Sequence, residues 1–170
     1  MINDIKWVQA QREATNWRQA VEIATRPLVA YGAAQPCYVN GIIENTLNWG
    51  PYYLIAPGIA LPHARPEQGA NYNQVSITTL RTPVAFGNEE CDPVWLLLCV
   101  SATDANAHIL TIQRISQFID SPQRLAAVGN ASTDDALFAL AREGCRIISA
   151  SVNLIPAQTV HRLCWHFPLP

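Results

Sequence analysis

Two histidines are the strongest candidates for chemistry in this sequence, and the first is His63. It lies in the stretch 56–66, where a Pro-Gly pair predicts a turn and Pro62 biases the preceding residue away from helical dihedral angles. We therefore expect a stiff, extended segment that fixes the direction of the imidazole. Arg65 lies two residues later, on the same side of an extended chain, where its guanidinium could bind a phosphate or a carboxylate. Its charge would also favour neutral His63, the form that a nucleophile requires.

The second candidate is His108, which begins an apolar stripe. Ile112, Ile115 and Ile119 follow it at intervals of four, three and four residues, so a helix over 104–119 would turn His108 toward the core from its first turn. A helix N-terminus carries unpaired N–H groups and partial positive charge, which favour an anion and disfavour an imidazolium. Neutral His108 could then donate a hydrogen bond to a phosphoryl oxygen. Its place after an apolar strand also fits the rule that open α/β sheets bind ligands beyond the carboxyl ends of their strands.

Each histidine also has a purely structural interpretation. His63 could be an exposed loop residue, and His108 could be a core histidine. Together they could contribute to a metal site, although the sequence places no third ligand near them. Phosphate-loop, dinucleotide-binding, zinc-protease and hydrolase motifs are all missing from the sequence. We therefore expect neither a metal nor a cofactor.

Composition narrows the class of protein further. The 170 residues, 49% of them hydrophobic, are sufficient for one compact core, while 14% charged residues and a net charge of −2 argue against nucleic acid or anionic lipid as a partner. The longest apolar run, over residues 94–100, is far shorter than the ~20 residues of a membrane-spanning helix. The N-terminus lacks a secretory signal, so we expect a cytoplasmic protein whose five cysteines are reduced thiols.

The pattern of apolar residues predicts an α/β fold with a mixed sheet flanked by helices. Asn16 is a good N-cap for the first helix, in which Pro27 predicts a kink or an early end. The uninterrupted apolar run over 94–100 is typical of a strand covered on both faces. No element is expected within residues 1–15. Helices are expected over 16–31, 36–49, 104–119, from 121 onward and from 132 to 141, and strands over 52–56, 75–80 and 94–100.

Two segments carry a resemblance to a known family. GIALPHARPEQG and, farther along, ATDANAHILTI, with TLRTPVAFGN and DPVWLLLCV between them, resemble the paired signature of the enzyme IIA component of the sugar phosphotransferase system (PTS), mannitol/fructose type. NWGPYYLIAPGIALPHARPE and DANAH are similar to the ascorbate branch of this family. The resemblance covers about residues 10–143. It implies the mixed-sheet fold of that family, His63 as the phosphorylated histidine and His108 as the second active-site histidine.

The resemblance also implies partners. Phospho-HPr would donate a phosphoryl group to His63, and a cysteine of a cognate IIB component, associated with a membrane IIC component, would accept it. The IIB phosphate loop is missing from the sequence, so the chain would be a free-standing IIA that does not itself insert into the membrane. The sequence leaves open which ring nitrogen is phosphorylated.

The sequence departs from the family pattern in two places. Mannitol-type members carry an arginine in the helix before the active loop, whereas the stretch GIIENTLNWG has none, so Arg65 either supplies that charge or none is needed. Beyond residue 146 nothing matches the family, and we expect a domain over 1–146 followed by an irregular tail over 147–170. Two other functions stay open, namely a regulatory IIA-like module whose phosphorylation controls a target protein, and a metal-dependent hydrolase.

Overall fold

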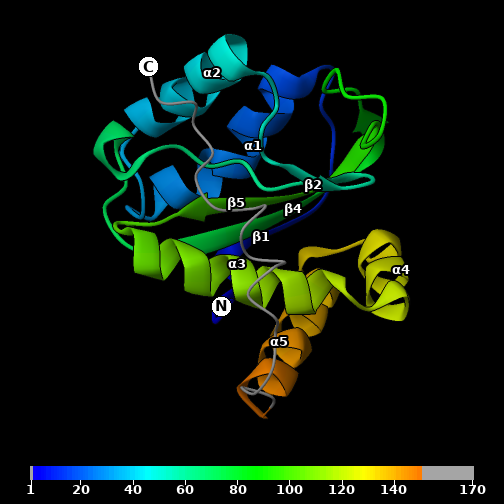
Figure 1. Ribbon diagram of the computed structural model, residues 1–170. Coiled ribbons are helices and arrows are strands. Elements are labelled where there is room, and N and C mark those ends of the chain that lie inside the picture. Colours follow the sequence, from blue (N-terminus) through cyan, green and yellow to red (C-terminus); the bar gives the residue numbers. More distant parts are fainter. Residues whose placement is uncertain (1, 151–170) are drawn as a thin grey trace.

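A mixed five-stranded sheet lies at the centre of the computed structural model, which describes residues 2–150, with side chains up to residue 143 (Figure 1). In spatial order its strands are β1 (Val8–Arg12), β4 (Gln74–Val84), β5 (Val94–Ser101), β3 (Ile59–Ala60) and β2 (Leu54–Ala56). β5 pairs antiparallel with β4 and parallel with β3, while β1 is parallel to β4 and β2 is antiparallel to β3. The predicted mixed sheet is therefore confirmed.

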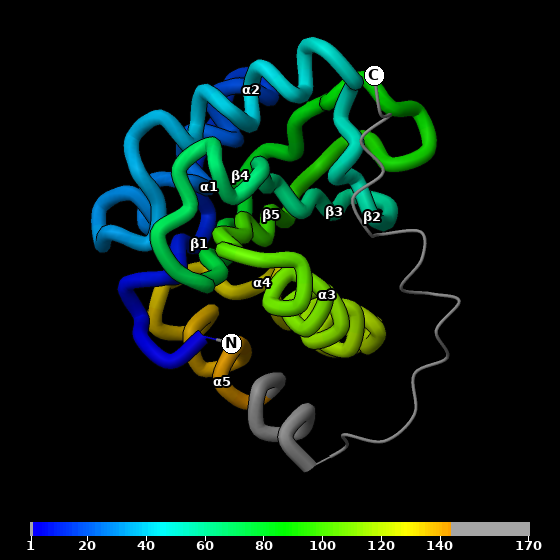
Figure 2. Tube along the Cα trace, turned by 60° about the vertical axis from the view of Figure 1, so that its left-hand side comes forward, coloured from blue at the N-terminus to red at the C-terminus, as the bar shows by residue number. Residues whose placement is uncertain are grey.

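Helices cover both faces of this sheet. α1 (Trp17–Ala30) and α2 (Cys37–Trp49) lie on one face, and α3 (Ala105–Ile119) and α5 (Asp134–Ala150) lie on the other, an arrangement that Figure 2 shows from a second direction. β5 is buried between these layers, with the side chains of residues 96–100 fully inaccessible, as its uninterrupted apolar run predicts. Between α3 and α5 the chain forms a further helix, α4 (Pro122–Asn130).

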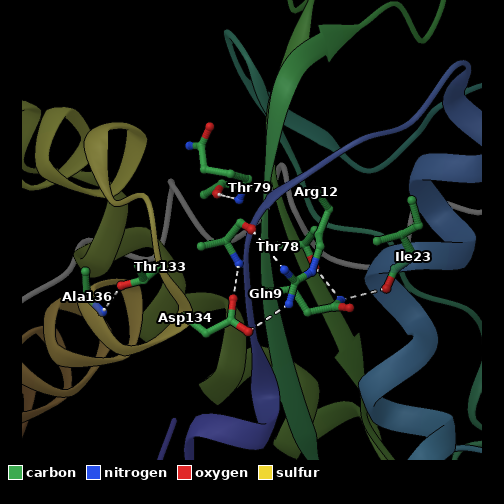
Figure 3. Close-up of polar contacts among 10 residues, drawn as sticks. Gln9, Arg12, Ile23, Thr78, Thr79, Thr133, Asp134 and Ala136 are labelled. Carbon is green, nitrogen blue, oxygen red and sulfur yellow. Dashed lines mark hydrogen bonds and ion pairs between the residues drawn. The ribbon is translucent and has the colours of Figure 1, made fainter.

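Two strands were not expected from the sequence, the two-residue β3 and β1, and for β1 buried Gln9 explains why (Figure 3). A polar residue at the second position of the strand hides its apolar pattern. Pro27 lies inside α1 without ending it and has no N–H to donate to the carbonyl of Ile23, four residues earlier. Gln9 Nε2 donates to that carbonyl at 2.7 Å and to Thr78 Oγ1 at 2.9 Å. A glutamine is therefore buried here because a proline elsewhere leaves a helix carbonyl to be satisfied.

The first residue of α5 contacts the outer edge of β1. Asp134 Oδ1 accepts a hydrogen bond from the Ala10 N–H at 2.7 Å, and its other oxygen pairs with Arg12 at 2.7 Å (Figure 3). The helix continues to Ala150, whereas the sequence indicated its end at Ala141 and an irregular chain soon afterwards. Of the expected tail, residues 147–150 are thus helical, and 151–170 lie outside the described residues. None of the helices between residues 2 and 150 has the length and apolar character needed to cross a membrane.

Candidate active site

The structure brings His63 and His108 side by side. His63 follows β3 and His108 belongs to the helix that follows β5, and these two strands are parallel neighbours, so their carboxyl ends lie at the same edge of the sheet. The ring centroids are 4.9 Å apart and the ring planes are inclined by 46°. Only 7% of His63 and 1% of His108 is exposed. His63 is therefore not the exposed loop residue of the structural interpretation.

Backbone hydrogen bonds hold the segment that carries His63. The Leu61 N–H donates to the Tyr53 carbonyl at 2.8 Å, and the Val100 N–H donates to the Pro62 carbonyl at 3.0 Å. The segment therefore stays attached to β5 and to the chain before β2, although it has no regular strand of its own beyond Ala60. The stiff, extended approach that Pro62 predicts is confirmed.

The side-chain hydrogen bond of His63 distinguishes its two ring nitrogens. Nδ1 lies 2.8 Å from the Leu61 carbonyl oxygen, which can only accept, so Nδ1 carries the hydrogen and Nε2 carries the lone pair of the neutral ring. Burial lowers the pKa of His63, and the bond to Leu61 opposes that effect in part. The ring is therefore a neutral imidazole with its lone pair on Nε2.

His108 is also a neutral imidazole. Burial, and in second place the charge that a protonated His63 would bring, lower the pKa of His108 to about 4. Asp104 caps α3 by accepting a hydrogen bond from the Ala107 N–H at 2.9 Å, which fixes the first turn that presents His108. The predicted stripe is confirmed at Ile112 and Ile115, whereas its last fully buried position falls on a neighbouring phenylalanine.

Arg65 lies in the His63 loop and contacts the end of α2. Its guanidinium is 5.5 Å from the ring centroid of Trp49 at the end of α2. Burial raises the pKa of Tyr52 above its ordinary value, and the charge of Arg65 opposes this rise only in small part. Tyr52 in turn meets the His63 ring edge to face, with centroids 5.2 Å apart. The predicted action of Arg65 on a bound anion stays a prediction.

Sequence reasoning missed the side chains that order the His63 loop. Gln68 Oε1 accepts hydrogen bonds from the Arg65 N–H and from Asn45 Nδ2, each at 2.9 Å, and so ties the loop to α2. Tyr38 and Tyr52 contact the backbone at His63 itself. Apart from the Arg65–Gln68 contact, which spans three residues, these contacts join residues that are 11 or more positions apart, so no local pattern indicates them.

The remaining predicted chemistry concerns thiols and metals. Burial raises the pKa of Cys99 to about 12, and its sulfur contacts Thr25 Oγ1 at 3.6 Å, so it packs as a small core residue. Cys37, Cys91 and Cys99 are free thiols. Within residues 2–150, no three His, Cys, Asp or Glu side chains are grouped as metal ligands. The expectation of a metal-free protein stays a prediction.

Comparison with known proteins identifies the family. The model of the family described as "Phosphoenolpyruvate-dependent sugar phosphotransferase system, EIIA 2" matches residues 1–143. The Escherichia coli K12 protein that carries the name phosphotransferase IIA component SgcA is 98% identical over 140 residues, which are 82% of this chain and 98% of that protein. The ascorbate-specific PTS EIIA component of Salmonella typhimurium is 42% identical over 101 residues, which are 59% of this chain and 66% of that protein.

Solved structures agree with this assignment. The solution structure of the mannitol-specific cryptic phosphotransferase enzyme IIA CmtB from Escherichia coli has a TM-score of 0.73 and 34% identity, and the match covers 82% of this chain and 93% of that one. The α/β fold with a mixed sheet is thus that of the enzyme IIA proteins, as predicted. The chain belongs to the EIIA 2 family of the phosphoenolpyruvate-dependent sugar phosphotransferase system, and it is a phosphoryl carrier of such a system.

Proposed function

We propose that Nε2 of His63 carries the phosphoryl group between phospho-HPr and the cysteine of a cognate IIB component, which works with a membrane IIC component. The observation that carries this proposal is the pairing of Nδ1 with the Leu61 carbonyl, which places the lone pair of a neutral, buried imidazole on Nε2, the ring nitrogen that faces away from that carbonyl. We further propose that the chain does this work in the cytoplasm, where HPr and the IIB component would meet it.

Each transfer replaces one bond to phosphorus by another. In the first step the lone pair of His63 Nε2 attacks phosphorus, the P–N bond to the donor imidazole breaks, and its electron pair returns to the donor ring. In the second step a IIB thiolate attacks, the P–N bond to His63 breaks, and the ring recovers its neutral form with the hydrogen still on Nδ1. The protein supplies position and charge stabilisation in both steps, since the phosphoryl group needs no further activation.

His108 is placed to stabilise the charge on the transferring group. Because its ring is neutral and only 4.9 Å from that of His63, it can donate one hydrogen bond to an equatorial phosphoryl oxygen. Arg65 is the second candidate for this stabilisation. Its guanidinium is held against Trp49 at the end of α2, which is the helix that lacks the arginine of mannitol-type members.

Exposed apolar side chains on the two helices beside the histidines support successive docking of two proteins. On α2, Leu47 is 59% exposed and Trp49 is 39% exposed, and on α3 Leu110 is 55% exposed. Large apolar residues that stay accessible near a reactive group are typical of transient protein interfaces. The same surface would meet HPr and IIB in turn, since the two partners use one phosphoryl group.

Reconstitution tests the assignment. Incubation with phosphoenolpyruvate, enzyme I and HPr should add one phosphoryl group by intact mass, stable in base and lost in mild acid, and His63→Ala should add none. The matched controls are His161→Ala and His166→Ala, because both histidines lie beyond the family match over residues 1–143. An acid-stable label, or one that His63→Ala retains, contradicts the proposal.

A further inference from the structure

We propose that Tyr38 and Tyr52 are positioning residues for phosphoryl transfer, because their hydroxyl groups hold the two polar groups of one peptide unit. This inference rests on the proposed role of His63. Tyr52 Oη donates to the His63 carbonyl, and Tyr38 Oη accepts from the Ala64 N–H at 3.1 Å. These backbone groups belong to the same peptide bond, so side chains fix its orientation at both ends.

The segment around this peptide gains its order from such contacts. β3 ends at Ala60, and no regular strand ladder continues past it. The orientation of the 63–64 peptide sets the direction of the Cα–Cβ bond of His63, and the bond from Nδ1 to the Leu61 carbonyl then sets the ring. A rotated peptide would displace Nε2 from the line of attack, where a misplacement of about 1 Å costs on the order of a hundredfold in rate.

Tyr38 connects this peptide to the second histidine. Its hydroxyl lies 2.7 Å from the Val100 carbonyl, to which it donates, with the Ala64 carbonyl a longer alternative at 3.3 Å. Val100 is the penultimate residue of β5, and the next helix along the chain carries His108. One fully buried hydroxyl thus links the backbone at His63 to the strand that leads to His108.

Tyr52 contributes shape as well as a hydrogen bond. Its half-buried ring stands at 87° to the imidazole of His63, so it limits movement of that ring on one side. Burial raises the pKa of both tyrosines above their ordinary value, so the hydroxyls keep their hydrogens over the pH range of any transfer assay.

Tyr53 provides a matched control. It is as buried as Tyr38, and it neighbours Tyr52 in the chain, but its hydroxyl accepts from Thr46 Oγ1 at 3.0 Å within the α2 side of the core. Tyr→Phe at each of the three positions removes one oxygen and the hydrogen bonds that it makes, which at Tyr38 are those with the Ala64 N–H and the Val100 carbonyl. Only the changes at Tyr38 and Tyr52 remove a hydrogen bond from the 63–64 peptide.

The experiment is a rapid-quench time course of single-turnover transfer from phospho-HPr, at several HPr concentrations. Tyr52→Phe and Tyr38→Phe should lower the maximal rate about tenfold to a hundredfold and change the half-saturating HPr concentration less than twofold, since docking is untouched. Tyr53→Phe should transfer at the wild-type rate. Because the two hydroxyls act on one peptide, the double variant should lose less than the product of the two single losses.

Three results decide the matter. A wild-type transfer rate in Tyr52→Phe or Tyr38→Phe overturns the proposal. An equal loss of transfer rate in Tyr53→Phe, with an equal fall in melting temperature, also overturns it, since the effect is then general destabilisation. Should Tyr38→Phe fail to fold, Tyr52→Phe at the half-buried position decides alone. His63→Ala in the same assay separates the two claims: if it still accepts phosphate, the carrier assignment fails, and if it is inactive while Tyr52→Phe is normal, only the tyrosine inference fails.

Discussion

His63 and His108 lie side by side, yet the chain holds them by different means. His63 belongs to an irregular segment that individual hydrogen bonds from tyrosines and neighbouring strands keep in place. His108 belongs to a capped helix whose buried isoleucines anchor it to the core. Loss of a single oxygen atom should therefore disturb the first histidine, whereas only loss of packing or of the ring itself should disturb the second. The proposed chemistry divides in the same way, since the proposed carrier lies on the irregular segment and the proposed stabilising group lies on the capped helix.

The largest expected effect short of losing the carrier comes from His108. We expect His108→Ala to become phosphorylated on His63 but to transfer about a hundredfold more slowly in both steps, because one preorganised donor to the phosphoryl group is missing. His108→Gln keeps a donor and should retain more activity. Rapid-quench measurements of HPr-to-IIA and IIA-to-IIB transfer provide the test. Wild-type rates in His108→Ala for both steps would show that His108 is only a core residue.

Acid should destabilise the folded protein through both histidines, because burial lowers the pKa of each. The pKa of His108 falls from 6.5 in the unfolded chain to about 4 in the folded protein, so the unfolded state binds more protons between these values. The stability that neutral His108 contributes is thus complete above pH 6.5 and is lost as the pH falls toward 4, by about 3 kcal/mol at most. Urea unfolding at a series of pH values should show this slope, and His108→Gln should flatten it. An unchanged slope in His108→Gln contradicts the prediction.

A smaller effect is expected from Arg65. Arg65→Met should lower the rate of transfer about tenfold at an unchanged melting temperature, since a half-exposed charge is removed and little core packing is lost. Arg65→Lys should recover part of the rate, because it keeps the charge but not the planar contact with Trp49. The matched control is Arg81→Met, which also removes one arginine, here from an exposed ion pair with Glu13. Equal rates for Arg65→Met and the wild type would show that Arg65 does not assist phosphoryl transfer.

The smallest effect is expected from the tail. Deletion of residues 151–170 should leave the melting temperature and the phosphorylation of His63 nearly unchanged, because the family match ends at residue 143. Deletion from residue 147, at the predicted end of the domain, also shortens α5, which continues to Ala150, and should cost slightly more. Thermal melts of both truncated chains test this. Unfolding of the shorter deletion would show that the tail completes the core.

The parts of this fold that follow from local chemistry could be predicted from the sequence. Asn16 and Asp104 cap helices as their types indicate, and the apolar run over 94–100 is a doubly covered strand. The two histidines could be singled out from a proline-stiffened segment and a helical stripe. Their proximity did not follow from the local pattern, because it depends on the parallel pairing of β3 with β5, and only the family resemblance implied it.

The parts that depend on distant partners escaped prediction. The hydroxyls of Tyr38 and Tyr52 reach the His63 peptide from another helix and another loop, and nothing in their immediate neighbours indicates it. β1 was missed because its apolar pattern is interrupted by Gln9, whose side chain donates to the Ile23 carbonyl of α1. In each case a polar side chain satisfies a backbone group far away in the chain, which periodicity does not record.

The bond between Gln9 and the Ile23 carbonyl has a consequence for how this sequence can change over time. Substitution of Gln9 by an apolar residue would leave that carbonyl buried without its donor, as long as Pro27 provides no N–H. Replacement of Pro27 by alanine would restore a helical N–H that competes with Gln9 for the same oxygen. Once the alanine is present, however, an apolar residue at position 9 becomes tolerable. The order of the two substitutions therefore matters, and the proline must change first.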